Sequence, residues 1–560
     1  MSRPSRVARP DKSDLRGVWR CEVLADRPEI ALKFRSQRGR IRLISLVATG
    51  ILTLAACGVP FVTRATSIGS SSFYRQLSTF LSSSFFITDR RNVAPPLPAG
   101  NTLYFRGSLG TLVEPSTLCP GTLTVNDNGD ASDAAAGDGV CETASGNGVC
   151  TLRAAVEEAN GETSCSGAVT INFNGSLSGG TITLSSGNEI QIARDLNING
   201  LGANLLTIDG GSGTNRIFYM GPYTVSISGV TMQNGHGGGT GINNVGGAMY
   251  VAGNVSGGGT LTLDSVVVQN NTASSSAGGV YYGLGSNHRI IDSTFTGNSS
   301  FACGGFFKSS SDHLYMVNST ISGNSVTSSG LAGGGFCDYG SGMVVRNSTI
   351  TDNHANNSGW GGGILLNSST MNIGNTIVAG NTVAGANSFG PDIFGSGSIT
   401  SAGYNLIGNN AQVTNQITPQ FPGGTPNGNN DWVGTAASPI NPELAALANN
   451  GGPTPTHALN TGSLAIDHGN NALAVDPFNS SALSFDQRGS SFSRTQGDSV
   501  DIGAFESAYT TAPVISYTAL GDTSSTGNRT LSITVTDSSG VPTSGTGLPK
   551  IYFRKGTSGS

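Results

Sequence analysis

Acidic and basic side chains that could act on a polysaccharide are spread along the middle of this sequence rather than gathered. Hydrolysis of a glycosidic bond uses two carboxyl groups a few ångströms apart, and a lyase uses carboxylates that bind Ca²⁺ beside a base. The candidates fall roughly one to a repeat, at Asp264, Asp292, Asp312, Asp338 and Asp352 among the acids and Arg289, Lys308 and Arg346 among the bases. This spacing favours solvated strand and turn residues, so we expect no catalytic site, no metal site and no cofactor.

A second group of charged residues lies near the C-terminus. We interpret these residues as ion pairs and turn hydrogen bonds that close the last coil of the fold: Asp467, Asp486, Arg488, Asp501 and Glu506. His457 lies among them, and we expect it to form a structural hydrogen bond rather than to bind a metal.

The elements that carry these residues are repeats of about 27 residues. Each repeat has a short apolar-alternating strand, then Ser-Thr, an apolar residue, two further residues and Asn, as in IDSTFTGN (291–298), VNSTISGN (317–324) and RNSTITDN (346–353). Paired glycines before an apolar residue follow most copies, as in Gly304-Gly305-Phe306. The aligned asparagines are Asn234, Asn271, Asn298, Asn324, Asn353 and Asn381.

Such a period combined with alternating apolarity predicts an all-β solenoid, a right-handed parallel β-helix over residues 169–415. Asparagine suits a corner because it tolerates a left-handed backbone and its amide can bond to the next coil, so we expect the asparagines to stack. The paired glycines allow a positive φ or a close backbone approach. A leucine-rich repeat is disfavoured because no helical segment or leucine framework recurs.

A solenoid needs capped ends. Residues 122–168 are predicted to form an N-terminal cap with a helix at 151–160, where Leu152, Ala155, Val156 and Ala159 share one face. Arg153 and Glu157 have the spacing of an i,i+4 pair, and Gly161 can end the helix.

The N-terminal region differs in charge from the rest. Residues 1–57 hold 12 Lys and Arg but five Asp and Glu, so the remainder is acidic, which argues against nucleic acid as a partner. Residues 43–56 are apolar, too short for a membrane span of about 20 residues, and typical of a signal peptide. Cys57 follows as a candidate lipidation site, and residues 58–121 are a Ser-rich linker.

Export permits disulfides. Cys141 and Cys150 enclose a short loop and are the favoured pair, with Cys119 and Cys165 as a second candidate. Cys303 and Cys337 are expected to stay apart. Aligning their glycine pairs places them four positions apart on neighbouring strands, an offset of about 13 Å at about 3.3 Å per residue, far beyond the roughly 4.4–6.8 Å between Cα atoms that a disulfide needs.

Three parts of the chain resemble modules of bacterial surface proteins. Cys150, Leu152 and Arg153 resemble the CSLREA domain, although Ala154 replaces its glutamate. Phe295 to Asn298 and the glycine pairs resemble polymorphic outer-membrane protein repeats. Residues 416–506 resemble the choice-of-anchor Q domain through NNGGPTPTHAL (449–459) and DIGAFE (501–506). The resemblance implies a secreted or cell-surface protein, associated with the outer membrane through an anchor, and no known activity. Residues 507–560 resemble the start of an immunoglobulin-like module, truncated at the end of the sequence.

We therefore expect a non-catalytic, adhesin-like scaffold that binds extracellular glycans or surface proteins and meets a membrane only through an anchor. Parallel β-helices also host pectin-degrading enzymes, and Gly235-His236-Gly237 resembles a short polygalacturonase motif. The other motifs of that family are missing around it, so we interpret His236 as a loop residue in an insertion. A polysaccharide lyase or glycoside hydrolase stays open as the alternative.

Overall fold

A computed structural model describes residues 121–536 of the chain, apart from short gaps. The gaps are 163–166, 254–258, 284, 286, 310–312, 328–331, 341, 357–359, 386–388, 412–420, 509–513 and 522–526. The predicted leader, nearly all of the predicted linker and the residues Cys57, Cys119 and Cys165 lie outside the described residues.

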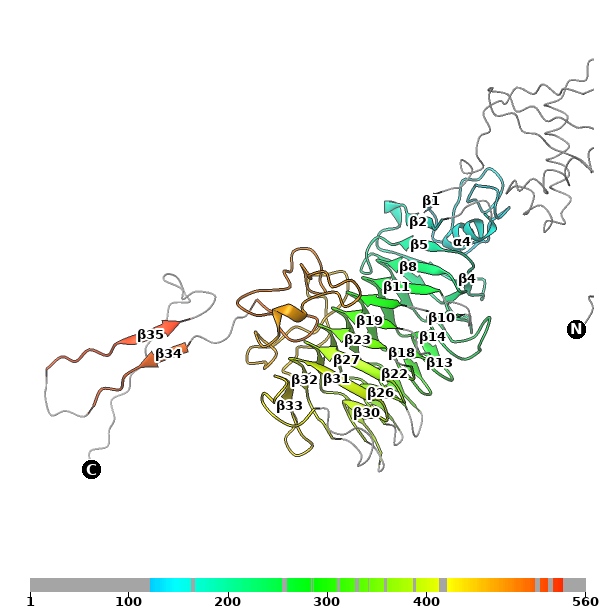
Figure 1. Ribbon diagram of the computed structural model, residues 1–560. Coiled ribbons are helices and arrows are strands. Elements are labelled where there is room, and N and C mark those ends of the chain that lie inside the picture. The colour runs from blue at the N-terminus through cyan, green and yellow to red at the C-terminus, as the bar shows by residue number, and fades with distance from the viewer. Residues whose placement is uncertain are drawn as a thin grey trace, which may run out of the picture. The chain divides into compact units, whose positions relative to one another are not determined.

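The body is a stack of parallel β-strands arranged in four sheets (Figure 1). Sheet I has ten strands: β1 (Thr122–Val125), β2 (Val169–Phe173), β5 (Leu196–Asn199), β8 (Thr224–Ser228), β11 (Thr260–Asp264), β15 (His288–Ile291), β19 (Leu314–Val317), β23 (Met343–Arg346), β27 (Thr370–Gly374) and β31 (Ser398–Gly403). Sheet II also has ten: β3 (Gly180–Thr183), β6 (Leu206–Asp209), β9 (Thr231–Gln233), β12 (Val267–Gln269), β16 (Thr294–Thr296), β20 (Thr320–Ser322), β24 (Thr349–Thr351), β28 (Ile377–Val378), β32 (Leu406–Ile407) and β33 (Trp432–Val433).

The other two sheets are shorter. Sheet III has five two-residue strands: β13 (Thr272–Ala273), β17 (Ser299–Ser300), β21 (Ser325–Val326), β25 (His354–Ala355) and β29 (Thr382–Val383). Sheet IV has eight: β4 (Ile190–Ile192), β7 (Phe218–Met220), β10 (Met249–Val251), β14 (Val280–Tyr282), β18 (Phe306–Lys308), β22 (Phe336–Asp338), β26 (Ile364–Leu366) and β30 (Ile393–Gly395).

A central coil of the chain visits sheets I, II, III and IV in that order and then enters the next coil. Strand alternation sends every second side chain inward. In β8, for example, Val225 and Ile227 are buried and Ser226 between them is not. The inward residues of successive coils form one continuous apolar core. The β-solenoid predicted from the repeats is therefore confirmed.

The stack extends beyond residues 169–415 at both ends. β1 lies in the segment expected to be a cap and pairs in register with β2, Leu123 opposite Ile171. β33, in the segment expected to follow the solenoid, pairs with β32. The repeat signature did not mark either strand because neither carries the asparagine or the glycine pair.

Helix α4 (Leu152–Gly161) packs beside the first coils. Thr151 caps its N-terminus by accepting a hydrogen bond from the Ala154 amide, and its apolar face is fully buried, as the spacing predicted. The predicted i,i+4 pair is wrong: Arg153 pairs with Asp130 at 2.7 Å, while Glu157 accepts from the Asp133 amide. Within the described ranges, no helix is long and apolar enough to cross a membrane.

The chain after β33 folds back along the outside of the stack, drawn in orange in Figure 1. We call residues 442–507 the C-terminal strap, because its hydrogen bonds reach coils that lie far earlier in the sequence, such as Thr454 to the Asp292 carbonyl. Further on, β34 (Val514–Tyr517) and β35 (Ile533–Thr536) pair antiparallel as a separate two-stranded hairpin.

Candidate binding surface and the networks around it

The repeat asparagines form a buried ladder between sheets II and III. In each step the side-chain oxygen of one asparagine accepts from the backbone N–H and the side-chain amide of the asparagine one coil earlier. Asn324 thus accepts from Asn298 at 3.1 and 2.9 Å, and donates to Asn353 at 2.9 Å. The members of this Asn ladder are Asn271, Asn298, Asn324, Asn353 and Asn381.

Asn234 is not part of the ladder, which corrects our alignment. Gln233 pairs with Gln269, so Asn234 lies opposite Asn270, and Gly235 donates its N–H to Asn271. The left-handed backbone also lies one residue before the ladder, at Asn234, Asn270, Gly297, Gly323, Asp352 and Gly380. The ladder asparagines therefore act through their amides, and because they are buried they offer no surface to a sugar.

A second ladder runs along the corner between sheets I and II. The Ser293 hydroxyl accepts from the Val266 N–H at 3.1 Å, and the next members, Ser319 and Ser348, repeat this contact one coil later each time. Asn405 continues the role by accepting from the Thr376 N–H. The serine of the repeat signature is therefore a buried corner residue.

The threonine of the signature faces outward and is covered by the C-terminal strap. Thr320 donates to the Gln487 side chain at 2.6 Å, Thr294 donates to the Pro455 carbonyl at 2.7 Å, and Thr349 accepts from the Ala504 N–H at 3.0 Å. Beside them, Ile377 packs in an apolar cluster with strap residues such as Phe505. Sheet II over these coils is thus an internal interface.

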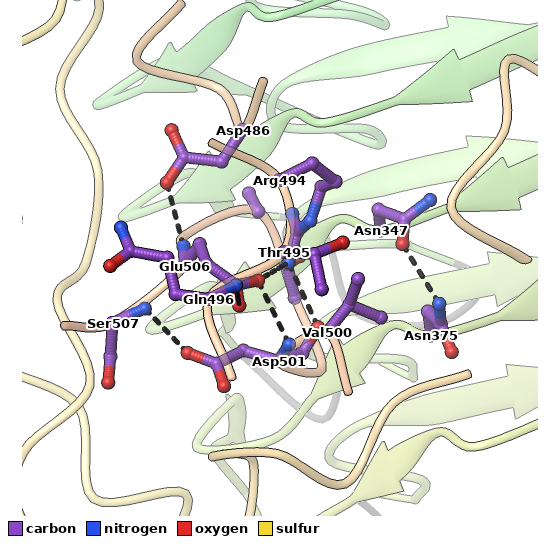
Figure 2. A network of polar contacts seen from close by, with 12 residues as sticks. Asn347, Asn375, Asp486, Arg494, Thr495, Gln496, Val500, Asp501, Glu506 and Ser507 are labelled. Carbon is purple, nitrogen blue, oxygen red and sulfur yellow. Dashed lines mark hydrogen bonds and ion pairs between the residues drawn. The ribbon is translucent and has the colours of Figure 1, made fainter. Parts of the chain in front are cut away.

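The charged residues of the strap form a buried network (Figure 2). Arg494 pairs with Glu506 at 2.9 Å, and both side chains are fully buried. Glu506 also accepts from the Asp501 N–H, and Asp501 accepts from the Ser507 N–H. Burial raises the pKa of both carboxyl groups, while the nearby Arg494 guanidinium lowers it.

The ion pairs and turn hydrogen bonds expected in this region are present, but they run along several coils instead of closing only the last one. Asp486 pairs with Arg488, and Asp467 donates its backbone N–H to Asp501. Gly503, beside Arg494 and Glu506, donates to the Asn375 carbonyl next to β27, the strand before the last of sheet I. Gln487, beside Asp486 and Arg488, accepts from Thr320 two coils earlier. His457 makes two hydrogen bonds, to the Ala445 carbonyl and the Ser322 hydroxyl, and burial lowers its pKa.

Asp264 and Asp292 lie on adjacent coils and interact electrostatically. Burial raises the pKa of Asp292 well above its usual range, and the Asp264 charge adds to the effect. Two hydrogen bonds join the strap to this corner. Thr454 of the strap donates to the Asp292 carbonyl, and Asn318 of the solenoid donates to the carbonyl of Phe485 in the strap. No group of three or more metal-binding side chains occurs in the part of the chain that the structure describes.

His236 lies in the stack rather than in an inserted loop. It forms a parallel bridge with Thr272, and its N–H donates to the Asn215 carbonyl. The residue is therefore a corner position of an early coil, equivalent in place to sheet III.

Two disulfides are present among the described cysteines. Cys141 and Cys150, the favoured pair, are bonded with their Cα atoms 5.2 Å apart. Cys303 and Cys337 are also bonded, with Cα atoms 5.6 Å apart, so our expectation that they stay separate is wrong.

The register behind that expectation is nevertheless the observed one. Cys303 pairs with Gly333 and Cys337 with Phe307. The error was to treat the chain between them as extended. It bends at the glycine pair Gly304-Gly305, and this bend lets the two cysteines meet.

An aromatic column covers the outer face of sheet IV. Tyr219, Tyr250, Tyr281 and Phe307 occupy the same register position on four successive strands. Their ring centroids are 5.8, 5.4 and 5.0 Å apart. Tyr250 is 8% exposed, and the other three rings are half-buried. The four rings thus form a partly exposed aromatic stripe on sheet IV.

The column is held from one side by an ordered loop. Arg216 is fully buried, pairs with Glu189 at 2.9 Å and donates to the carbonyls of Gly237, Thr240 and Ile242. Its guanidinium also lies 5.2 Å from the centre of the Tyr250 ring. These bonds fix the loop against the column.

A polar pocket of about 360 Å³ adjoins the column at its N-terminal end. Gln191 lines the pocket and is in register with Tyr219, so it is the next outward position after the aromatic residues. The other lining side chains include Ser132, Glu157 and Asn160. Pocket and column together form one surface of hydrogen-bonding groups followed by rings, which could hold a sugar chain.

The fold defines the chain as a parallel β-solenoid. In comparisons with known proteins, no protein-family model, no curated protein and no solved structure matches the sequence.

Proposed function

We propose that this chain is a non-catalytic, adhesin-like scaffold of the cell surface or the secreted fraction, and that it binds glycans along sheet IV. The observation that carries the proposal is the aromatic column. Sugar rings pack their C–H faces on aromatic rings, and tyrosine adds a hydroxyl for hydrogen bonds. The repeat spacing of the column matches a polymeric ligand better than a single small molecule.

Several features support a scaffold rather than an enzyme. The strap covers the corner where two carboxylates approach, and the carboxylates of the strap network are buried and engaged with arginine or backbone N–H groups. A polysaccharide lyase or hydrolase remains the alternative function.

The module resemblances extend the proposal. We assign residues 122–168 the role of an N-terminal cap, with α4 as its core, on a right-handed β-helix. Parallel strand crossovers are almost always right-handed. The hairpin β34–β35 is then the start of an immunoglobulin-like module, and an anchor of the choice-of-anchor type would hold the protein at the membrane. Surface proteins are the second class of partner.

Glycan binding by the purified chain tests the proposal. A panel of polysaccharides first identifies one that the wild-type chain binds. We expect Tyr219→Ala and Tyr281→Ala each to weaken binding to that polysaccharide about five- to tenfold, because one stacking contact contributes roughly 1 kcal/mol. Tyr315→Ala is the matched control, since Tyr315 is a half-buried outward tyrosine of sheet I. Binding that is unchanged in the column variants, or lost equally in the control, would rule out the column as the site.

The same preparation separates the enzymatic alternative. Incubation with acidic and neutral polysaccharides, with and without Ca²⁺, should release no oligosaccharides. Reproducible release that is abolished by Asp292→Asn would instead establish catalysis at the covered corner.

A further inference from the structure

Three polar residues occupy consecutive inward positions in the core of sheet IV. The inward position at the end of each strand is apolar in most coils, as at Ile192, Met220, Val251 and Leu366. In the three coils between Val251 and Leu366 it is held by Tyr282, Lys308 and Asp338. Nothing in the surface function described above requires polar groups inside the solenoid.

Lys308 and Asp338 face each other directly. They are partners in the register of β18 and β22, and the Lys308 Nζ lies 3.2 Å from Asp338 Oδ1. Both side chains have 0% exposure. The Gly340 N–H also donates to Asp338 Oδ1, at 3.0 Å. An amine, a carboxyl group and a backbone donor therefore meet in a dry site.

A simple ion pair is a poor explanation for this arrangement. Desolvation of two charges offsets much of their attraction, and well-packed apolar residues in their place are often as stable or more stable. The leucine at the same position in the next coil, Leu366, shows that the site accepts an apolar side chain. Burial also raises the pKa of Asp338 to about 6, although Lys308 lowers it. Burial therefore favours the neutral acid form of Asp338.

We propose that Lys308 and Asp338 condense to an intramolecular amide that covalently joins two coils. A proton first passes from the Lys308 ammonium to the Asp338 carboxylate. The neutral amine then attacks Asp338 Cγ, and the negative charge develops on Oδ1, where the Gly340 N–H donates. Oδ2 leaves with its proton and one proton from the amine, so the products are one amide and one water. The fold holds the two groups together, which replaces an external activating reagent with proximity.

Tryptic mapping of the purified full chain after disulfide reduction tests the proposal. Lys308 is the sole Lys or Arg between Arg289 and Arg346. An amide at Lys308 removes the tryptic site, so we expect peptide 290–346 uncut and lighter by one water molecule. Chymotryptic cleavage after Tyr315 should leave its two halves joined. Unmodified peptides 290–308 and 309–346, at their full masses, would overturn the proposal.

Two variants provide controls that do not depend on stability. Lys308→Arg keeps the positive charge and the tryptic site, and Asp338→Ala keeps the lysine without a carboxyl partner. In both, cleavage after position 308 should be complete and the mass deficit absent. A deficit that persists in either variant would place the lost water elsewhere and refute the bond. The wild-type map is decisive even if a variant folds poorly.

Discussion

The asparagine that ends each repeat stabilises the corner through its side chain. The Asn324 amide bonds to the coil before and the coil after, while the left-handed backbone falls on Gly323. Sequence alone predicted that these asparagines stack, because amides can repeat a contact at each coil. It could not separate the two neighbouring columns, since asparagine also fills the left-handed one at Asn234 and Asn270.

Removing one ladder amide should therefore lower stability. Asn324→Ala leaves the Asn298 N–H without its acceptor and removes one of the two acceptors of the Asn298 side-chain amide, so we expect the free energy of unfolding to fall by about 2–4 kcal/mol. Chemical denaturation measures the change. Asn199→Ala, at an exposed asparagine of sheet I, should shift it by less than about 0.5 kcal/mol. Equal effects at both positions would contradict the ladder's role.

At the scale of elements, the solenoid strands were predictable and the C-terminal strap was not. Strand alternation is local, so Val225 and Ile227 could be read as inward residues directly. The strap packs on the solenoid through contacts such as Thr320 to Gln487, which are 167 residues apart. Because these contacts follow no periodic sequence pattern, the sequence could not predict them. The same limit explains the cysteines: Cys303 and Cys337 follow the predicted register, but a turn in the chain decides their distance.

The strap should be released before the solenoid when its buried ion pair is broken. Arg494→Ala leaves the Glu506 carboxylate buried without its cation, a change that costs about 3–5 kcal/mol. We expect proteases to cut within residues 442–507 at a higher rate while the strands of sheets I and IV stay protected. Mass spectrometry of limited digests gives the cut sites.

Arg529→Ala is the control, since Arg529 lies in the exposed hairpin region outside the strap. Digestion that begins in the solenoid of the Arg494 variant, or a strap as resistant as in the wild type, would show that the network does not hold the strap.

At the scale of the whole molecule, buried carboxyl groups set the dependence of stability on pH. Burial raises the pKa of Asp392 to about 7, and raises those of Asp501 and Glu506. In the unfolded chain such groups titrate near about pH 4. Between these limits the folded state binds more protons than the unfolded state, so its stability falls as pH rises.

We therefore expect a higher thermal unfolding midpoint at about pH 5 than at about pH 8. Burial lowers the pKa of His457, which acts in the opposite direction below about pH 6.5, but it is one group against several carboxyl groups, which also include Asp292 and Asp338. Calorimetry over this range, at constant ionic strength, measures the trend. A midpoint that rises steadily toward pH 8 would contradict the raised carboxyl pKa values.

The hydrogen bonds of both side-chain ladders all run in one direction, from earlier coils to later ones, and this bears on how far the stack of coils can continue. In each ladder the N–H groups of one coil donate to a side-chain oxygen of the next coil. Each ladder ends on an aspartate: Asn381 donates to Asp392, and Asn405 donates to Asp431. Both oxygens of Asp392 already accept N–H groups, Oδ1 from Asn381 and Oδ2 from Asn409. Stacked coils with open ends are a natural template for fibre growth. A ladder that ends on an acceptor with both oxygens occupied offers no side-chain donor to a further coil, so the two ladders set the length over which the coils are joined through side chains.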